Sequence, residues 1–233
     1  MIMNKEHVKE AQETWNAIAK SFDSTRHKTW KPCMDFIESL SEDSIAIDIG
    51  CGNGRHLIPC AKRCSKVIGL DVSIEMLKIL QDKIEKKKLE NVTLIHGDAA
   101  DIPLDDNSVD AALYIAALHS IRGRENRLNS LKEVKRILKP GGKALISVWT
   151  KWRDEHKKSF FQKITRKGLP EHGDKNIHWR QHGLNVSRFY HIYTKKNLIK
   201  DIKEAGLEIV NFEGVRLHTQ KHPDNYFVIL QNL

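Results

Sequence analysis

Cysteine is scarce in this chain, and its spacing excludes the usual cysteine-based frameworks. No two of the four cysteines form a Cys-x-x-Cys pair, and their spacing does not fit a disulfide framework. Cys60 and Cys64 lie one helical turn apart, but no second pair of ligands stands at zinc-like spacing. We therefore expect packed or exposed thiols and no metal site. The cysteines are Cys33, Cys51, Cys60 and Cys64.

Long apolar runs are also missing. No stretch approaches the roughly 20 apolar residues that cross a bilayer, and residues 1–10 are polar and charged, without the apolar core of a signal peptide. The sequence contains neither an internal repeat nor a low-complexity linker. We therefore expect a cytoplasmic protein with no membrane partner, and a single domain over residues 1–233.

The chain has an excess of positive charge. Its formal net charge is +9 and its pI is near 9.3, which favours anionic partners, with nucleic acid first and acidic lipid second. The same composition also fits an ordinary solvated surface, so charge alone decides nothing.

Short apolar segments alternate with amphipathic helical ones over most of the chain. Helical spacing of apolar residues predicts helices over residues 8–22 and through residue 40, within an N-terminal helical segment, residues 1–42. Strands are predicted over residues 44–50, 66–72, 92–97, 109–117, 143–149, 207–215 and 226–230, and further helices over residues 74–86, 125–138 and 195–205. This alternation predicts an α/β fold in which helices cover both faces of a parallel sheet.

Three local signals refine these boundaries. Ser73 is the predicted N-cap of the helix over residues 74–86. The run Pro140-Gly141-Gly142 is predicted to end the helix before it. Residues 151–193, after the fifth strand, are basic with little periodicity, so they are predicted to form a long insertion or lid.

A glycine turn follows the first predicted strand, in the sequence Ile-Asp-Ile-Gly-Cys-Gly-Asn-Gly over residues 47–54. Gly50 and Gly52 allow the main chain to approach a ligand closely. A dinucleotide-binding fingerprint would need its third glycine where Arg55 stands. Asp48 would repel a pyrophosphate but suits a ligand that carries an ammonium and a sulfonium.

Acidic residues close the next two predicted strands. Asp71, about 20 residues after the turn, can accept hydrogen bonds from both hydroxyls of a ribose. Asp98 can accept from an adenine amino group, while the Ala99 N–H serves a ring nitrogen. Each aspartate alone fits a helix cap equally well. Together with Asp48 and the glycine turn, they favour one ligand site, since the ends of parallel strands meet at one edge.

These residues resemble the motifs of the class I S-adenosylmethionine (SAM) methyltransferases, and so do the strand over residues 110–117 and the Leu-Lys-Pro-Gly-Gly run over residues 138–142. The resemblance implies a Rossmann-like, seven-stranded, mostly parallel sheet with one inserted antiparallel strand and the third strand at an edge. It also implies SAM as cofactor. The implied cofactor-binding residues are Trp15, Asp48, Gly50, Cys51, Gly52, Asn53, Asp71, Asp98, Ala99 and Ile115.

The outlying segments are similar to one group of these enzymes, the eukaryotic and archaeal tRNA wobble-uridine carboxymethyl methyltransferases. The similar segments are residues 15–32, 117–120, 188–193 and 223–228. Two positions depart from that pattern: Ser120 follows His119 where a pair of histidines is expected, and Pro32 comes one place late. The resemblance implies methyl esterification of the carboxymethyl group of 5-carboxymethyluridine at the tRNA wobble position.

Such a reaction needs no strong base, because a carboxylate is already ionised at neutral pH. The protein must instead align the nucleophilic oxygen, the methyl carbon and the sulfur. The catalytic candidates are Arg26, His119, Arg188, His191 and Tyr193. The arginines are predicted to hold phosphate or the uridine carboxylate, and Tyr190 or Tyr193 to stack on a flipped base. A structural role competes for each: a surface ion pair, a core contact or a hydrogen-bonded strand end.

Two partners follow from these features. Cations interleaved with aromatic residues in the insertion favour the tRNA anticodon stem-loop, although a solvated lid explains them nearly as well. The resemblance implies a small zinc-ribbon activator protein docked on the edge strand Val92–Ile95, unless a helix of the chain covers that edge. Two other functions stay open: a methyltransferase for a quinone or lipid precursor, and a catalytically silent RNA-binding scaffold.

Overall fold

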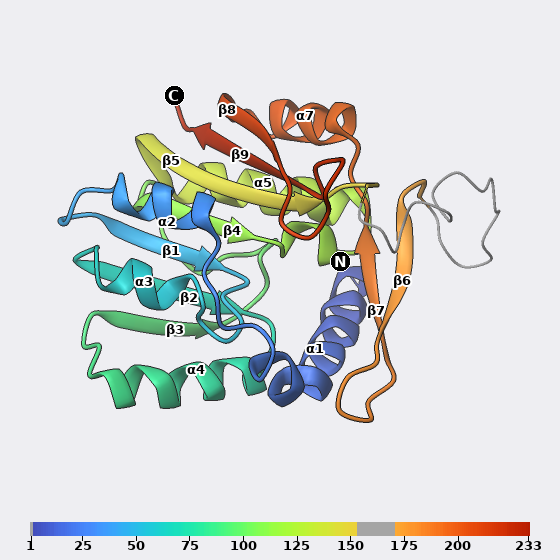
Figure 1. Cartoon of the computed structure of the whole chain (residues 1–233). Coiled ribbons are helices and arrows are strands. Elements are labelled where there is room, and N and C mark those ends of the chain that lie inside the picture. The colour runs from blue at the N-terminus through green and yellow to red at the C-terminus, as the bar shows by residue number, and fades with distance from the viewer. Residues whose placement is uncertain (1, 153–170) are drawn as a thin grey trace.

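Most of the described β-strands form one sheet, which the computed structural model places at the centre of the fold (Figure 1). The structure describes residues 2–152 and 171–233. Within that part of the chain seven strands are hydrogen-bonded in the order β3-β2-β1-β4-β5-β9-β8. Their bounds are β1 Ile45–Ile49, β2 Lys66–Asp71, β3 Val92–His96, β4 Val109–Ile115, β5 Leu138–Trp149, β8 Glu208–Val215 and β9 Asn225–Gln231.

Strand direction in the sheet agrees with the predicted class. The strands from β3 to β5 pair in parallel, whereas β9 is antiparallel to both of its neighbours, β5 and β8. β1 and β4 lie at the centre and are almost wholly buried, as parallel strands covered on both faces must be. The Rossmann-like α/β fold, the antiparallel insertion and the edge position of the third strand are confirmed.

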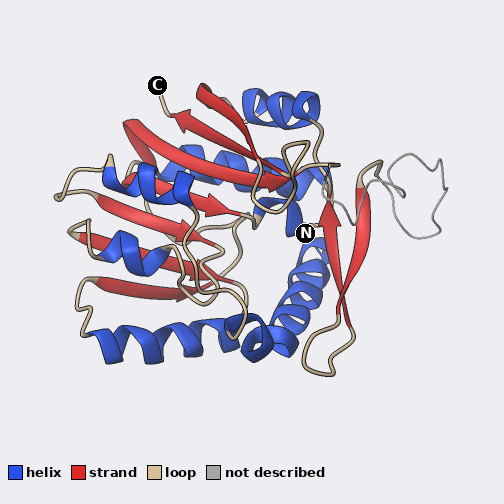
Figure 2. Cartoon of the chain, viewed as in Figure 1, coloured by secondary structure: helices blue, strands red, loops and turns tan. Residues whose placement is uncertain are grey.

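Helices cover both faces of this sheet (Figure 2). On one face α2, α3 and α4 contribute Phe36, Leu57 and Leu80 to a core with β1 and β4. On the other face α5 and α7 contribute Leu131 and Ile202. The helix bounds are α1 Ile2–Asp23, α2 Lys31–Glu38, α3 Leu57–Ala61, α4 Ile74–Lys87, α5 Arg124–Ile137 and α7 Lys195–Glu204, with a 3-10 turn, η1, at Leu118–Ser120.

α1 stands at the end of the sheet to which the parallel strands point, and it contacts the start of α4 (Figure 1). Ser73 is the N-cap of α4, as predicted, and its Oγ accepts a hydrogen bond from the Met76 N–H at 3.2 Å. Asn16 of α1 reaches the same place: its Oδ1 accepts from Ser73 Oγ at 2.7 Å and from the Glu75 N–H at 3.2 Å. One asparagine therefore joins the two helices.

The insertion predicted over residues 151–193 contains regular structure that its low periodicity did not indicate. β6 (Asp174–Trp179) and β7 (Val186–His191) form an antiparallel hairpin, a second sheet beside α1. The hairpin was not predicted because the charged residue Arg188 occupies a buried position in β7. It therefore interrupts the alternation of apolar and polar residues by which strands are recognised. Residues 153–170, which belong to the predicted basic insertion, lie outside the described residues.

The Pro140–Gly142 run is also placed differently from the prediction. α5 does end before it, at Ile137, but β5 begins at once with Leu138 and includes the run. The backbone of the run is hydrogen-bonded to the C-terminal end of the chain. The Gly141 N–H donates to Asn232 O at 2.6 Å, and the Asn232 N–H donates to Gly142 O at 3.0 Å. Among the described helices, none is long and apolar enough to cross a membrane.

Candidate active site

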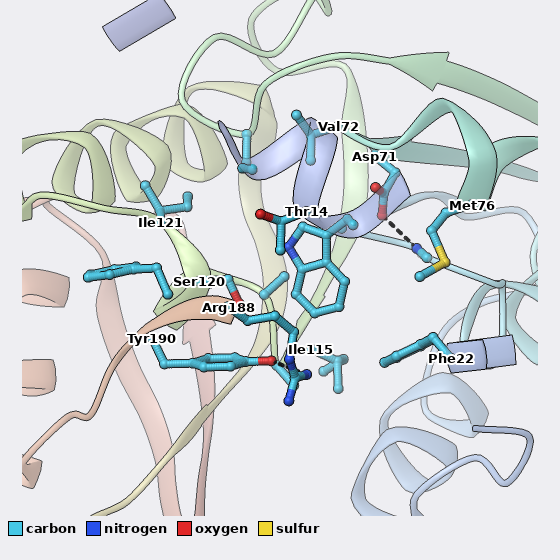
Figure 3. A pocket seen from close by; sticks show the side chains of 18 of the residues that line it. Thr14, Phe22, Asp71, Val72, Met76, Ile115, Ser120, Ile121, Arg188 and Tyr190 are labelled. Carbon is cyan, nitrogen blue, oxygen red and sulfur yellow. Dashed lines mark hydrogen bonds between the residues drawn. The ribbon is translucent and has the colours of Figure 1, made fainter. Parts of the chain in front are cut away.

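A cavity of about 320 Å³ opens at the carboxyl ends of the parallel strands. Its walls come from α1, the glycine turn after β1, the ends of β2 and β4, the η1 turn and the β6–β7 hairpin. Figure 3 shows Asp71 and Met76 at one side of it and Arg188 and Tyr190 at the other. Twelve of the predicted site residues line this cavity: Trp15, Arg26, Asp48, Gly50, Cys51, Gly52, Asn53, Asp71, Asp98, Ala99, Ile115 and Arg188.

The glycine turn brings bare backbone to the cavity. Gly50 has a φ of +69°, and a Cβ there would lie 2.5 Å from the Cβ of Ala117, so this position is closed to larger residues. Gly52 has a φ of +52° and nothing within 4 Å of its missing Cβ. Its N–H donates to Asp71 Oδ2 at 2.7 Å, which ties the turn to the end of β2. A ligand can therefore lie against Gly52.

Asp48 is a buried carboxyl group that the fold leaves partly unsatisfied. It is 2% exposed, and its Oδ2 has no hydrogen-bond partner among the described residues. Burial, together with the nearby Asp71 carboxylate, raises the pKa of Asp48 to about 8. A cation bound in the cavity would favour the ionised form and satisfy this oxygen.

Asp71 and Asp98 differ from Asp48 in having protein partners. Asp71 accepts from the Ser73 N–H at 2.8 Å as well as from Gly52, and burial raises its pKa although both amides oppose that shift. Asp98 accepts from the Ala100 N–H at 3.0 Å, and burial raises its pKa too. Each carboxylate oxygen has two lone pairs, so both residues can still accept from ligand hydroxyl or amino groups.

The opposite wall is aromatic and holds one buried cation, Arg188. This residue is 7% exposed; its guanidinium lies 4.9 Å from the ring centre of Trp179 and donates through Nη1 to the Tyr190 hydroxyl at 2.6 Å. Among the described residues, its Nε has no hydrogen-bond partner, and its guanidinium forms no ion pair with a carboxylate. Tyr190 in turn stacks on Trp149, with ring centres 4.5 Å apart. This wall is therefore suited to an anionic, planar ligand.

The other three catalytic candidates do not line the cavity. His119 is fully buried behind the aromatic wall, where its Nδ1 accepts from the Trp149 N–H at 3.2 Å. His191 pairs through Nδ1 with Asp174 at 2.7 Å. The hydroxyl of Tyr193 donates to Asp201 at 3.2 Å. Each of these three residues therefore supports the surrounding structure and has no direct access to a ligand in the cavity.

Sequence reasoning missed two cavity residues directly after the glycine turn. The Arg55 guanidinium lies 4.1 Å from the ring centre of Trp30, and burial lowers its pKa to about 10. His56 is 4% exposed, burial holds its pKa well below the usual value, and neither ring nitrogen has a partner among the described residues. Their place beside the glycine motif was the available signal. The sequence did not show which way they point.

Comparison with known proteins shows which domain family and which fold this part of the chain resembles. The protein family described as "Methyltransferase domain" matches residues 47–146, from Asp48 and the glycine turn to β5. A SAM-dependent methyltransferase from Methanosarcina mazei has the same fold, with a TM-score of 0.75 at 22% identity over 88% of this chain and 99% of that one. Residues 47–146 therefore match the methyltransferase domain family, and the chain has the class I SAM-dependent methyltransferase fold.

Proteins named tRNA (carboxymethyluridine(34)-5-O)-methyltransferase are similar to this chain. The Mus musculus protein of that name, ALKBH8, is 33% identical over 72% of this chain. The matched part makes up only 24% of the length of the mouse protein. The Schizosaccharomyces pombe protein is 28% identical, with 94% of each chain covered. A further fold neighbour, 18% identical with a TM-score of 0.71 and 97% of each chain covered, comes from a complex between the Haloferax volcanii Trm112 methyltransferase activator and a methyltransferase.

The fold neighbour from Methanosarcina mazei is described as SAM-dependent, and the cavity of this chain fits SAM. The unsatisfied oxygen of Asp48 suits the cationic amino-acid end of SAM. Gly52 leaves room for the ligand against the turn, while Asp71 and Asp98 would hold the ribose and the adenine. The cofactor end and the Arg188 wall belong to one cavity, so a methyl donor and an anionic acceptor can meet in it.

Proposed function

We propose that this chain methylates the carboxylate of 5-carboxymethyluridine at the wobble position of tRNA, forming a methyl ester. The observation that carries this proposal is Arg188, a buried guanidinium without a carboxylate partner among the described residues, in the wall opposite the cofactor residues. A guanidinium binds a carboxylate through two parallel hydrogen bonds. The named relatives in mouse and fission yeast support the same acceptor.

The reaction places modest demands on the protein. SAM supplies a methyl group bound to a positively charged sulfur. Transfer of that methyl group to an acceptor carboxylate would exchange the carbon–sulfur bond for a carbon–oxygen bond and would give a neutral ester and a neutral thioether, with no proton to move. Arg188 would bind the carboxylate oxygen that does not react and so orient the oxygen that does. The aromatic wall would exclude water, which favours a reaction in which a carboxylate and a sulfonium lose their charges.

The acceptor base also needs a surface to lie on. Tyr190 lines the cavity and stacks on Trp149, so this pair supports the role of a stacking surface for a uridine flipped out of the anticodon loop. Tyr193, the other stacking candidate, is fully buried outside the cavity. Arg26 lines the cavity 5.5 Å from the Trp179 ring centre, and it remains a candidate for a phosphate of the anticodon stem-loop.

An activator protein of the zinc-ribbon class is the second part of the proposal, with the edge strand β3 as its docking site. β3 pairs only with β2 among the described strands, and Val92, Leu94 and Ile95 are partly buried. An exposed edge invites pairing with another chain. The Haloferax fold neighbour, which was solved in complex with an activator, supports this part.

The decisive experiment measures methyl transfer from labelled SAM to tRNA whose wobble esters have been hydrolysed to carboxylates. It is run with and without a co-expressed zinc-ribbon activator, and the product nucleoside is identified by mass spectrometry. We expect 5-methoxycarbonylmethyluridine. Cofactor binding without any tRNA product, even with the activator present, would contradict the proposal and favour a small-molecule acceptor.

A further inference from the structure

We propose that Asp23 and Lys83 are positioning residues for the cofactor: together they hold Asn53, the central residue of the glycine turn, in its binding conformation. These three residues, from the end of α1, from α4 and from the turn, are called the clasp below. The inference concerns the SAM site alone and does not depend on the acceptor.

The clasp is a closed set of hydrogen bonds. Asn53 Nδ2 donates to Asp23 Oδ1 at 2.8 Å and to the backbone oxygen of Arg26, also at 2.8 Å. Lys83 Nζ donates to the backbone oxygen of Asn53 at 3.0 Å and to the Asp23 carboxylate. Asn53 is thus held through both its side chain and its main chain, by two separate helices and the segment after α1.

The clasp is sheltered from water more than the other ion pair of α4. The side chains of Asp23 and Lys83 are each 26% exposed, and Asn53 is 2% exposed. The Lys78–Glu75 pair on the same helix has side chains that are 65% and 40% exposed. Burial would raise the pKa of Asp23, but hydrogen bonds from Lys83 and Asn53 outweigh it and lower that pKa. The carboxylate is therefore ionised and engaged at neutral pH.

The position of Asn53 explains why a clasp would matter for ligand binding. It lies between Gly52 and Gly54, both with positive φ, so its backbone has unusual freedom in the absence of restraints. Gly52 and Asn53 both line the cavity. A turn that is already fixed loses less conformational entropy when a ligand binds. Removing the clasp should therefore weaken cofactor binding without removing any group that we place against the cofactor's charges.

The same turn of α1 also contacts the acceptor wall, through a different residue. Ser21 Oγ accepts from Trp179 Nε1 at 2.8 Å and is hydrogen-bonded to His182 Nδ1 at 2.7 Å. Ser21 thus joins α1 to the hairpin, while Asp23 joins it to the glycine turn. The clasp hypothesis predicts that these two neighbours affect different ligands.

The test measures the dissociation constant of S-adenosylhomocysteine, the demethylated cofactor, by titration calorimetry on the full chain. We expect Lys83→Met and Asp23→Ala each to raise this dissociation constant about tenfold. Without the clasp, two or three groups of the turn would have to be ordered when the ligand binds, which costs free energy. Lys83→Arg, which keeps the charge, should stay within about threefold of wild type. Lys78→Met, the matched control on the same helix, and Ser21→Ala should not change it.

Thermal unfolding of the ligand-free variants separates positioning from general damage. Lys83→Met and Lys78→Met should unfold within a few degrees of one another, because each loses one ion pair of α4. The proposal is overturned when both clasp variants keep the wild-type dissociation constant within about twofold. It is also overturned when Lys78→Met or Ser21→Ala weakens binding as much as they do. Failure of the tRNA proposal would leave all of these readings intact.

Discussion

At the scale of single residues, Asp48 shows a conflict between stability and ligand binding. Its pKa is about 8 in the folded, ligand-free chain and 3.8 in a model peptide, so the folded state keeps a proton that the unfolded state releases between these values. Stability contributed by this group is therefore present below pH 4 and declines as the pH rises toward 8. The carboxyl group is retained at a cost in stability, as expected for a ligand-binding group.

Asp48→Asn should accordingly stabilise the ligand-free protein, and more so at pH 8 than at pH 5. The amide does not titrate, so its unfolding temperature should exceed that of wild type by a margin that grows with pH. The same variant should lose cofactor affinity by about tenfold or more, since a charged partner is worth about 1.5–3 kcal/mol. Thermal unfolding at both pH values and calorimetry check this. An equal margin at pH 5 and pH 8 would contradict the burial argument.

Arg188 should separate acceptor chemistry from cofactor binding. Arg188→Met removes the guanidinium but keeps much of the side-chain volume, and we expect methyl transfer to tRNA to fall about 30- to 100-fold, as for a lost charged hydrogen bond. Arg188→Lys should give an intermediate rate, because an ammonium cannot pair in two places. Cofactor affinity should stay within about threefold for both variants, and likewise for Arg26→Ala. Equal loss of transfer and cofactor affinity would exclude an acceptor role.

Residue positions were predictable where the fold alone brings them together. Asp48, Asp71 and Asp98 lie at or near the carboxyl ends of three parallel strands, β1 to β3, and such ends meet at one edge of the sheet. His191 and Tyr193 lie near Arg188 in sequence, but that nearness carries no such guarantee. His191 is paired across the hairpin with Asp174, and Tyr193 lies beyond the end of β7 and contacts α7 through Asp201. Their surroundings depend on a hairpin that the sequence pattern did not reveal.

At the scale of elements, the glycine turn should respond differently to substitution at Gly50 and at Gly52, which both line the cavity. Gly50→Ala combines a positive φ with a contact to Ala117 that is too close, so we expect a loss of about 2–4 kcal/mol in unfolding free energy. Gly52→Ala meets nothing within 4 Å and should cost only about 1 kcal/mol. Its methyl group would, however, stand beside the cavity and weaken cofactor binding. Denaturant titration and calorimetry compare the two, and unchanged cofactor affinity in Gly52→Ala would contradict the assigned site.

Helices with a clear period were predicted to exist where they are observed, although α1, predicted over residues 8–22, extends over Ile2–Asp23. α4 has its N-cap serine and apolar stripe, and its predicted and observed starts coincide at Ile74. β5 was predicted to start at residue 143 but begins at Leu138, because the C-terminal end of the chain accepts and donates hydrogen bonds along the proline-glycine run. That partner is about 90 residues away in sequence, beyond the reach of any local rule.

At the scale of the whole molecule, the net charge of +9 bears on the tRNA proposal through salt. Each phosphate neutralised on a single strand contributes about −0.7 to the slope of log affinity against log salt, and about −0.9 on a duplex. Three phosphate contacts therefore predict that raising salt from 50 to 200 mM weakens tRNA binding about 20- to 40-fold. Binding of S-adenosylhomocysteine, which lies in a cavity and contacts no phosphate, should change little over the same range. Fluorescence anisotropy with labelled tRNA measures the first quantity and calorimetry the second. If the affinity for tRNA does not change with salt concentration, the basic surface is solvated and does not bind the nucleic acid.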